Sequence, residues 1–256
     1  MAAIGIALLF VAGTILIAWS VYFATRALVG KTFGSDTEAL ASSVIFRVSA
    51  LHGLILALVF AQELLDYNEL QRVVLQEATA VADIYNEMRR YGGEDVAPVQ
   101  AALSDYLQVV SGPEWAALGE TQRLTGEGWR IWDDIYGRLL DLPPDTPRES
   151  ALRDHMLSKA QTMAALRQER EATALHGISP LFWFAALAGV VLVTIPYFIF
   201  APTRLHLVLL SIYGGFTGLV MYVIFAFSDP FGGPGAMVPA PFTRLLETEI
   251  GHHGTR

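Results

Sequence analysis

The stretch FRVSALHGLILALVFAQELLDYNELQRVVLQEATAVADIY, residues 46–85, decides the fold. Up to Ala61 it is apolar enough to lie in a bilayer. From Glu63 onward the apolar residues keep helical spacing while charged side chains fill another face. No proline or glycine interrupts the chain between Gln62 and Tyr85. These features predict one long helix that leaves the membrane and becomes the first helix of a water-exposed domain.

The composition supports a membrane protein. Of the 256 residues, 53% are hydrophobic and 16% are charged, whereas a soluble domain carries about a quarter charged residues. The apolar residues gather in blocks, which predicts membrane spans. Cysteine is absent from the chain, so neither disulfides nor thiolate metal sites are available.

Four apolar blocks are long enough to cross a hydrocarbon core of about 30 Å. They cover residues 2–24, about 43–61, 181–200 (interrupted by Pro196) and 205–227. The first is expected to be a retained span rather than a cleaved signal peptide, because no basic residue precedes it. The predicted fold is therefore an all-α membrane protein with spans 1 and 2 in residues 1–61, a helical domain in 62–178, spans 3 and 4 in 179–228, and a Pro/Gly turn and tail in 229–256.

Within the domain, amphipathic patterns predict further helices over residues 96–110, 114–140 and 147–175. The glycines at 92 and 93 are expected to end the long helix. Thr125 to Gly128 is a candidate break inside the 114–140 segment. Thr146 with Glu149 is typical of a helix start.

The charged residues are unevenly distributed along the chain. Residues 62–178 hold 11 basic and 20 acidic side chains, a balance of −9, against −8 for the whole chain. An acidic domain argues against nucleic acid and against anionic lipid surfaces as partners.

Basic residues of the short connections indicate the orientation. Arg26, Lys31, Arg47 and Arg204 are expected at the membrane face opposite the domain. The positive-inside rule then places the short loops in the cytoplasm. It places the helical domain and both termini in the periplasm, with the spans in a bacterial inner membrane.

One stripe of span 2 is a candidate pore lining. Helical spacing places five residues on or near one face, polar at one end and with a carboxylate at the other: Ser49, His52, Leu56, Val59 and Glu63. The alternative is that His52 reaches the headgroups and that Glu63 is simply solvated.

Small residues predict close helix packing, within one subunit or between subunits. They lie on a neighbouring face of span 2 and on span 4: Ala50, Gly53, Ala57, Gly214, Gly215 and Gly218.

Two carboxylates are candidates for ion contact. Glu77 lies among alanines and valines, and it is expected either to pair with an arginine such as Arg153 or Arg167, or to mark an ion route. Asp229 is expected either to cap the turn that follows span 4 or to contact an ion such as calcium.

Catalytic motifs are absent. The sequence contains no His-Glu-x-x-His, phosphate loop, nucleotide-binding glycine pattern or nucleophile elbow. We expect neither an enzyme nor a metal site, and no cofactor beyond the calcium considered for Asp229.

Several segments together resemble a family. EATAVADIY at residues 77–85, DPFGG at 229–233 and PAPF at 239–242 are similar to motifs of the bacterial bestrophin-like membrane proteins of unknown function. His52-Gly53 at the start of span 2 and Arg26 after span 1 agree with the layout of that family. The resemblance covers nearly the whole chain.

The resemblance implies similarity to bestrophins, which are pentameric anion channels with four spans per subunit and a cytoplasmic helical domain. The leading hypothesis is a homo-oligomeric ion channel whose pore is lined by span 2. The alternative is a non-conducting, membrane-anchored interaction or sensory module that acts through its helical domain. The selectivity stays open, because the family suggests anions whereas the acidic domain favours cations.

Overall fold

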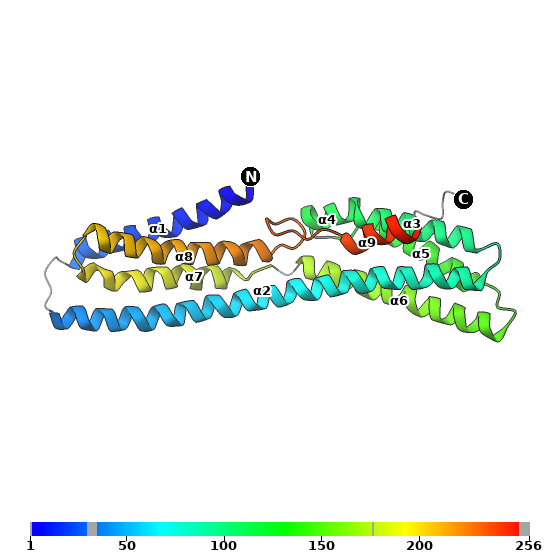
Figure 1. Cartoon of the computed structure of the whole chain (residues 1–256), viewed down its shortest axis with the longest axis horizontal. Helices are drawn as coiled ribbons and strands as arrows, with labels where there is room; N and C mark the ends of the chain where they lie inside the picture. Colours follow the sequence, from blue (N-terminus) through cyan, green and yellow to red (C-terminus); the bar gives the residue numbers. More distant parts are fainter. Residues whose placement is uncertain (1, 30–34, 176, 251–256) are drawn as a thin grey trace. The chain divides into compact units, whose positions relative to one another are not determined.

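The computed structural model describes residues 2–29, 35–175 and 177–250, and within these ranges it is helical, with no strand (Figure 1). The elements in chain order are α1 (Ala2–Val29), α2 (Ser35–Tyr91), α3 (Val96–Ser111), α4 (Pro113–Thr121), α5 (Gly126–Asp141), α6 (Pro147–Leu175), α7 (Pro180–Thr194), the 3-10 helix η1 (Ile195–Ile199), α8 (Arg204–Phe227), α9 (Ala240–Leu245) and the π-helix η2 (Leu246–Ile250). The predicted all-α fold is confirmed. In the described part of the chain, four helical stretches are long and apolar enough to cross a membrane, as expected of a multi-pass membrane protein.

The long helix is present. α2 runs unbroken for 57 residues and ends where glycine permits left-handed backbone, since Gly92 and Gly93 have φ of 81° and 87°. The predicted break inside the 114–140 segment also exists. Gln122 closes α4 with φ of 58°, and the Thr125 hydroxyl accepts a hydrogen bond from the Gly128 amide at 3.4 Å to start α5.

α6 begins with a capping box. The Glu149 amide donates to the Thr146 hydroxyl at 3.2 Å, and the Thr146 amide donates to the Glu149 carboxylate at 3.1 Å. Pro196 ends α7 as expected, because the chain tightens into η1 there.

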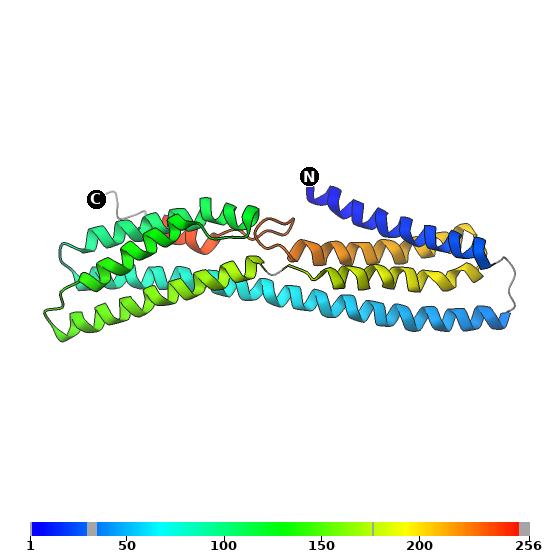
Figure 2. The ribbon, with the colours of Figure 1, turned by 180° about the vertical axis from the view of Figure 1, so that it is seen from behind.

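The chain divides into two compact units. The first, which we call the span unit, comprises residues 1–65 and 177–228; the second, the helical domain, comprises 66–176 and 229–256. α2 contributes to both. In the span unit, α1, α7, α8 and the first part of α2 lie side by side in both views (Figures 1 and 2).

Glycines bring α1 and α8 together inside the span unit. A Cβ on Gly218 would lie 2.6 Å from the Phe10 carbonyl oxygen, and one on Gly214 would lie 3.2 Å from the Ile15 Cα. The Thr14 hydroxyl donates to the Gly214 carbonyl at 2.7 Å. This close approach accounts for the small residues of span 4.

Arg26 has a structural role in the same unit. Its guanidinium donates to the carbonyls of Phe198 and Phe200, both at 2.8 Å, and the Tyr22 hydroxyl donates to Phe200 at 2.8 Å. The cation therefore satisfies carbonyls at the end of η1, where a helix exposes unpaired acceptors.

The helical domain encloses the main hydrophobic core, to which α2, α3, α4, α5 and α6 contribute. Residues after span 4 belong to this core. The indole of Trp115 donates to the Met237 carbonyl at 3.0 Å, and its ring meets those of Phe231 and Phe242 at centroid distances of 5.0 and 6.4 Å. The described part of the segment that the sequence predicts to be a separate turn and tail, residues 229–250, groups with the helical domain.

Candidate functional site

His52 joins three helices of the span unit. Its Nε2 lies 3.0 Å from the Ala186 carbonyl oxygen of α7, and its Nδ1 lies 3.0 Å from the Tyr213 hydroxyl of α8. A carbonyl oxygen only accepts, so Nε2 carries the proton and Nδ1 accepts from Tyr213. The ring occupies the space that a side chain on Gly189 would need, because a Cβ there would lie 2.5 Å from Nε2.

The rest of the predicted pore stripe follows the same face of α2. Leu56, like His52, is 4% exposed, and it packs with Ala186, Met221 and Ile224. Val59 packs against that cluster, and Ser49 and Glu63 are half-buried. In one chain this stripe is the packing face of α2; that it also lines a pore stays a prediction.

A neighbouring face of α2 carries the small residues and is open in the part of the chain that the structure describes. Ala50, Gly53, Ala57 and Ala61 are exposed, and a Cβ added to Gly53 would meet nothing within 4 Å. The small residues of α8 differ, since Gly214, Gly215 and Gly218 all face α1. Packing within the chain therefore explains the small residues of α8 but not those of α2.

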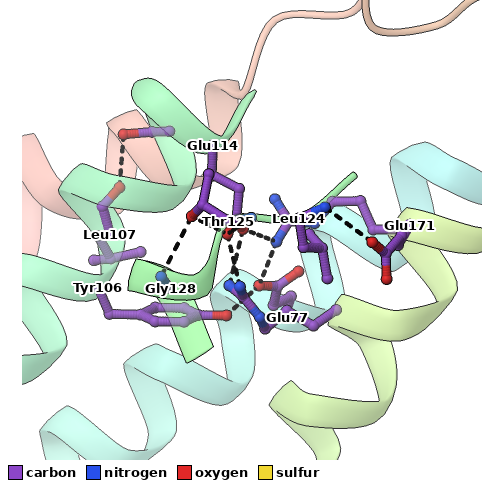
Figure 3. A network of polar contacts seen from close by, with 11 residues as sticks. Glu77, Tyr106, Leu107, Glu114, Leu124, Thr125, Gly128 and Glu171 are labelled. Atoms are coloured by element: carbon purple, nitrogen blue, oxygen red, sulfur yellow. Dashed lines mark hydrogen bonds and ion pairs between the residues drawn. The ribbon is translucent and has the colours of Figure 1, made fainter. Parts of the chain in front are cut away.

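A buried ion cluster lies inside the helical domain (Figure 3). It consists of Glu77 from α2, Tyr106 from α3, Glu114 from α4, and Arg167 and Arg170 from α6, all with 0% exposure. The two carboxylates and two guanidinium groups balance in formal charge, as buried charges require.

Glu114 is the centre of the cluster. Its carboxylate accepts from Arg167 at 2.8 and 2.6 Å and from Arg170 at 3.0 Å. The amide and hydroxyl of Thr125 donate to Glu114 at 3.2 and 2.9 Å, which fixes the start of α5. One carboxylate thereby connects α4, α5 and α6.

Glu77 accepts from the Tyr106 hydroxyl at 2.5 Å and from Arg170 at 3.3 Å. Burial raises its pKa above the ordinary value of 4.5, and the charge of Arg170 opposes that rise. Burial, and then the charge of Glu77, raises the pKa of Tyr106 well above 10.0. Tyr106 is therefore a protonated donor at any physiological pH.

Aromatic rings enclose the cations. The Arg167 guanidinium lies 4.7 Å from the Trp129 ring centroid and 5.6 Å from that of Tyr106. Arg170 lies 5.5 Å from the centroid of Phe242, which belongs to the segment after span 4. The PAPF motif thus supplies one wall of the cluster.

The expectation that Glu77 pairs with an arginine such as Arg153 or Arg167 holds for the residue type but not for the examples. Its hydrogen-bonding partners are Arg170 and Tyr106. Arg153 instead donates to the Leu142 carbonyl at 3.3 Å. The available signal was the pair of arginines three residues apart in α6, a spacing that places both on one face of the helix.

Asp229 caps a turn. Its Oδ1 accepts from the amides of Phe231 and Gly232 at 3.2 and 2.8 Å. Gly232 then approaches Gly119 so closely that a Cβ on it would lie 2.8 Å from the Gly119 carbonyl oxygen. Among the described residues no group of three or more His, Asp or Glu side chains is placed to hold a metal ion. Calcium at Asp229 or Glu77 stays an untested expectation.

Comparison with known proteins identifies the family. Residues 12–242 match the bestrophin-like domain, so the match covers nearly all of the chain. No curated protein and no solved structure matches the chain. The matched range contains three of the candidate spans in full and the first from residue 12 onward, together with the ion cluster and the motifs at 77–85, 229–233 and 239–242. The chain is a member of the bestrophin-like domain family.

Proposed function

We propose that this protein is an oligomeric ion channel of the membrane whose ion route is lined by the apolar half of α2. The observation that carries the proposal is the small-residue face of α2, on which Ala50, Gly53 and Ala57 are exposed and a Cβ on Gly53 would meet nothing within 4 Å among the described residues. Membership of the bestrophin-like family supports it. A helix with one face packed inside the subunit and a small-residue face open is suited to border a shared route.

For the route we propose a different face of α2 from the stripe predicted from the sequence. The stripe predicted from the sequence turns His52 and Leu56 into the subunit, where each is 4% exposed. Side chains held there position α2 against α7 and α8. Ala50, Ala57 and Ala61 lie on another, exposed face of the helix, and we assign the route to that face.

Introduced cysteines test the proposal, because the chain has none of its own. Purified protein in planar bilayers is expected to carry current. A charged thiol reagent is expected to reduce the current of Ala57→Cys and to leave that of its neighbour Leu56→Cys unchanged. The reverse pattern would return the route to the stripe predicted from the sequence.

A different outcome would remove the channel altogether. If no salt or calcium condition gives current, and the mass in detergent is that of one chain, the proposal is wrong. The protein would then be better described as a membrane-anchored interaction or sensory module. Pentameric assembly, suggested by bestrophins, is tested by the same mass measurement.

For the orientation, we propose a periplasmic helical domain in a bacterial inner membrane. Arg47 and Arg204 support this assignment through the positive-inside rule, while Lys31 lies outside the described residues. Arg26 contributes less to it, because its guanidinium is bonded to the carbonyls of Phe198 and Phe200. Val238 is 70% exposed in the helical domain, so an impermeant maleimide is expected to label Val238→Cys in intact spheroplasts. Labelling only after lysis would place the domain in the cytoplasm, as in bestrophins.

A further inference from the structure

An apolar groove crosses the surface of the helical domain between α2 and the segment that follows span 4. Two cavities of about 600 and about 420 Å³ adjoin, because both are bordered by Leu75, Ala240 and Pro241. On α2 the groove extends over residues 67–82 and on the other side over residues 236–248. With a rise of 1.5 Å per residue, it is about 22 Å long.

Aliphatic side chains dominate its walls. Leu75 and Val238 are 57% and 70% exposed, which is unusual for neighbouring large apolar residues in a folded domain. The cavity volumes lie within the range of small-molecule sites. A groove of this length and width suits a linear hydrocarbon chain.

One end of the groove is positively charged. Among the described residues that line the two cavities, Arg244 is the charged one. It lies at the end formed by Thr79, Ala82 and Thr248, whereas Tyr67 and Gln71 line the other end. This positive charge contrasts with the formal net charge of −9 carried by residues 62–178. A ligand with one negative end would therefore bind in one orientation, with that end at Arg244.

We propose that this groove binds a single-chain anionic amphiphile, a fatty acid, with its carboxylate at Arg244 and its acyl chain along Leu75 and Pro241. A peptide fits less well, since each of its residues would bring backbone polar groups that need partners. The walls offer few such partners, because Pro241 lacks an amide hydrogen and the Thr79 and Thr248 hydroxyls already donate to the carbonyls of Leu75 and Arg244.

Photolabelling of the full chain in phosphatidylcholine nanodiscs tests this inference. The probe is hexadecanoic acid with a diazirine in its chain, and peptide mass spectrometry is expected to locate the label in residues 67–82 and 236–248. Unlabelled hexadecanoate is expected to compete better than hexadecanol, and hexadecyltrimethylammonium is expected to compete least.

Two matched pairs of variants locate the site. Ala240→Trp fills the groove and is expected to remove most of the label. Ala101 is exposed on α3 outside the groove, so Ala101→Trp is expected to leave the labelling unchanged. Arg244→Gln is expected to weaken hexadecanoate competition about two- to fivefold, as suits an exposed ion pair. Arg123→Gln, at another exposed arginine, is expected to change nothing.

Three results would overturn the inference. Labelling that is unaffected by Ala240→Trp would place the probe elsewhere. Equal competition by the ammonium amphiphile would remove the role of Arg244. Efficient cross-linking of two copies through Val238→Cys, with no protection by hexadecanoate, would show that a second copy covers the groove.

Discussion

Arg167 and Glu114 form a two-pronged ion pair in which neither side chain is exposed to solvent, with Nη1 2.8 Å from Oε1 and Nη2 2.6 Å from Oε2. Removing two charges from water is costly, and their attraction offsets that cost only when the geometry is good and further hydrogen bonds are present. Thr125 and Arg170 supply those bonds to Glu114. The pair therefore determines how the nine-residue α4 is held against α6.

Breaking this pair is expected to destabilise the helical domain strongly. Arg167→Met leaves Glu114 buried with half of its ion pairing lost, and the free energy of unfolding is expected to fall by about 3–5 kcal/mol. Urea unfolding of the full chain in detergent, followed by tryptophan fluorescence to which the adjacent Trp129 contributes, measures this change. Arg130→Met is the control, because Arg130 pairs with Glu127 on the exposed surface and its loss is expected to matter far less.

A double-mutant cycle separates the pair from the rest of the cluster. Glu114→Gln combined with Arg167→Met is expected to cost clearly less than the sum of the two single changes, because the second change removes the partner left unpaired by the first. Strict additivity would contradict direct coupling between the two residues.

Gly128 is required by the same ion pair. A Cβ on Gly128 would lie 2.5 Å from Oε2 of Glu114 and 2.7 Å from Nη1 of Arg167. Gly128→Ala is therefore expected to lower the free energy of unfolding by about 1–3 kcal/mol through overpacking. Gly137 is the matched control in the same helix, since a Cβ there would meet nothing within 4 Å. Gly137→Ala is expected to stabilise α5 by about 0.5–1 kcal/mol, and equal losses in both variants would refute the packing argument.

Glu77 gives the stability of the domain a pH dependence. Its pKa is higher in the folded protein than the ordinary 4.5, because burial disfavours the carboxylate. A raised pKa means that the folded state holds the proton more tightly than the unfolded state. The stabilisation is complete below the ordinary pKa and is lost as the pH rises through the pKa of the folded state.

Glu77→Gln is expected to remove this contribution to the change of folding stability with pH. Glutamine keeps an oxygen acceptor for Tyr106 but does not titrate. Unfolding midpoints measured between pH 4 and pH 8 in steps of about half a unit check it. Glu127→Gln is the control, because Glu127 is exposed and hydrogen bonding to Arg130 lowers its pKa. An unchanged slope in Glu77→Gln would assign the pH dependence to another group.

Local signals were sufficient for most helix boundaries. Gly92 and Gly93 end α2, and Thr146 with Glu149 starts α6, because each of these features acts on neighbouring backbone. The ion cluster could not be obtained in this way. Arg170 lies 93 residues from Glu77 and 56 from Glu114 in the sequence, so their meeting depends on tertiary packing that no periodicity encodes.

The pore stripe shows a second limit. A polar residue at the end of an apolar helical face is equally expected whether that face borders water or a neighbouring helix. The sequence position of His52 fits either environment. Its hydrogen bonds to Ala186 and Tyr213 depend on the packing of α2 against α7 and α8, which the sequence pattern does not specify. The place of the segment after span 4 in the core depends on distant partners for a related reason, since Phe231 and Phe242 contact Trp115 and Phe242 also lies against Arg170.

The contact between His52 and Gly189 gives a last prediction, which concerns the span unit. A Cβ on Gly189 would lie 2.5 Å from Nε2 of His52, so Gly189→Ala is expected to displace the imidazole from Ala186 and to cost about 1–3 kcal/mol. Adding His52→Ala provides room for the new methyl group, and the double variant is expected to lose less than the two single variants together. Thermal unfolding in nanodiscs measures the loss.

Gly53→Ala serves as the control, because it adds the same methyl group to the open face of α2, where nothing lies within 4 Å. In one isolated chain that change has no steric cost. A loss of oligomer mass in Gly53→Ala without a loss of chain stability would therefore indicate that the open face of α2 meets a neighbouring subunit, because only a close helix contact is sensitive to one methyl group.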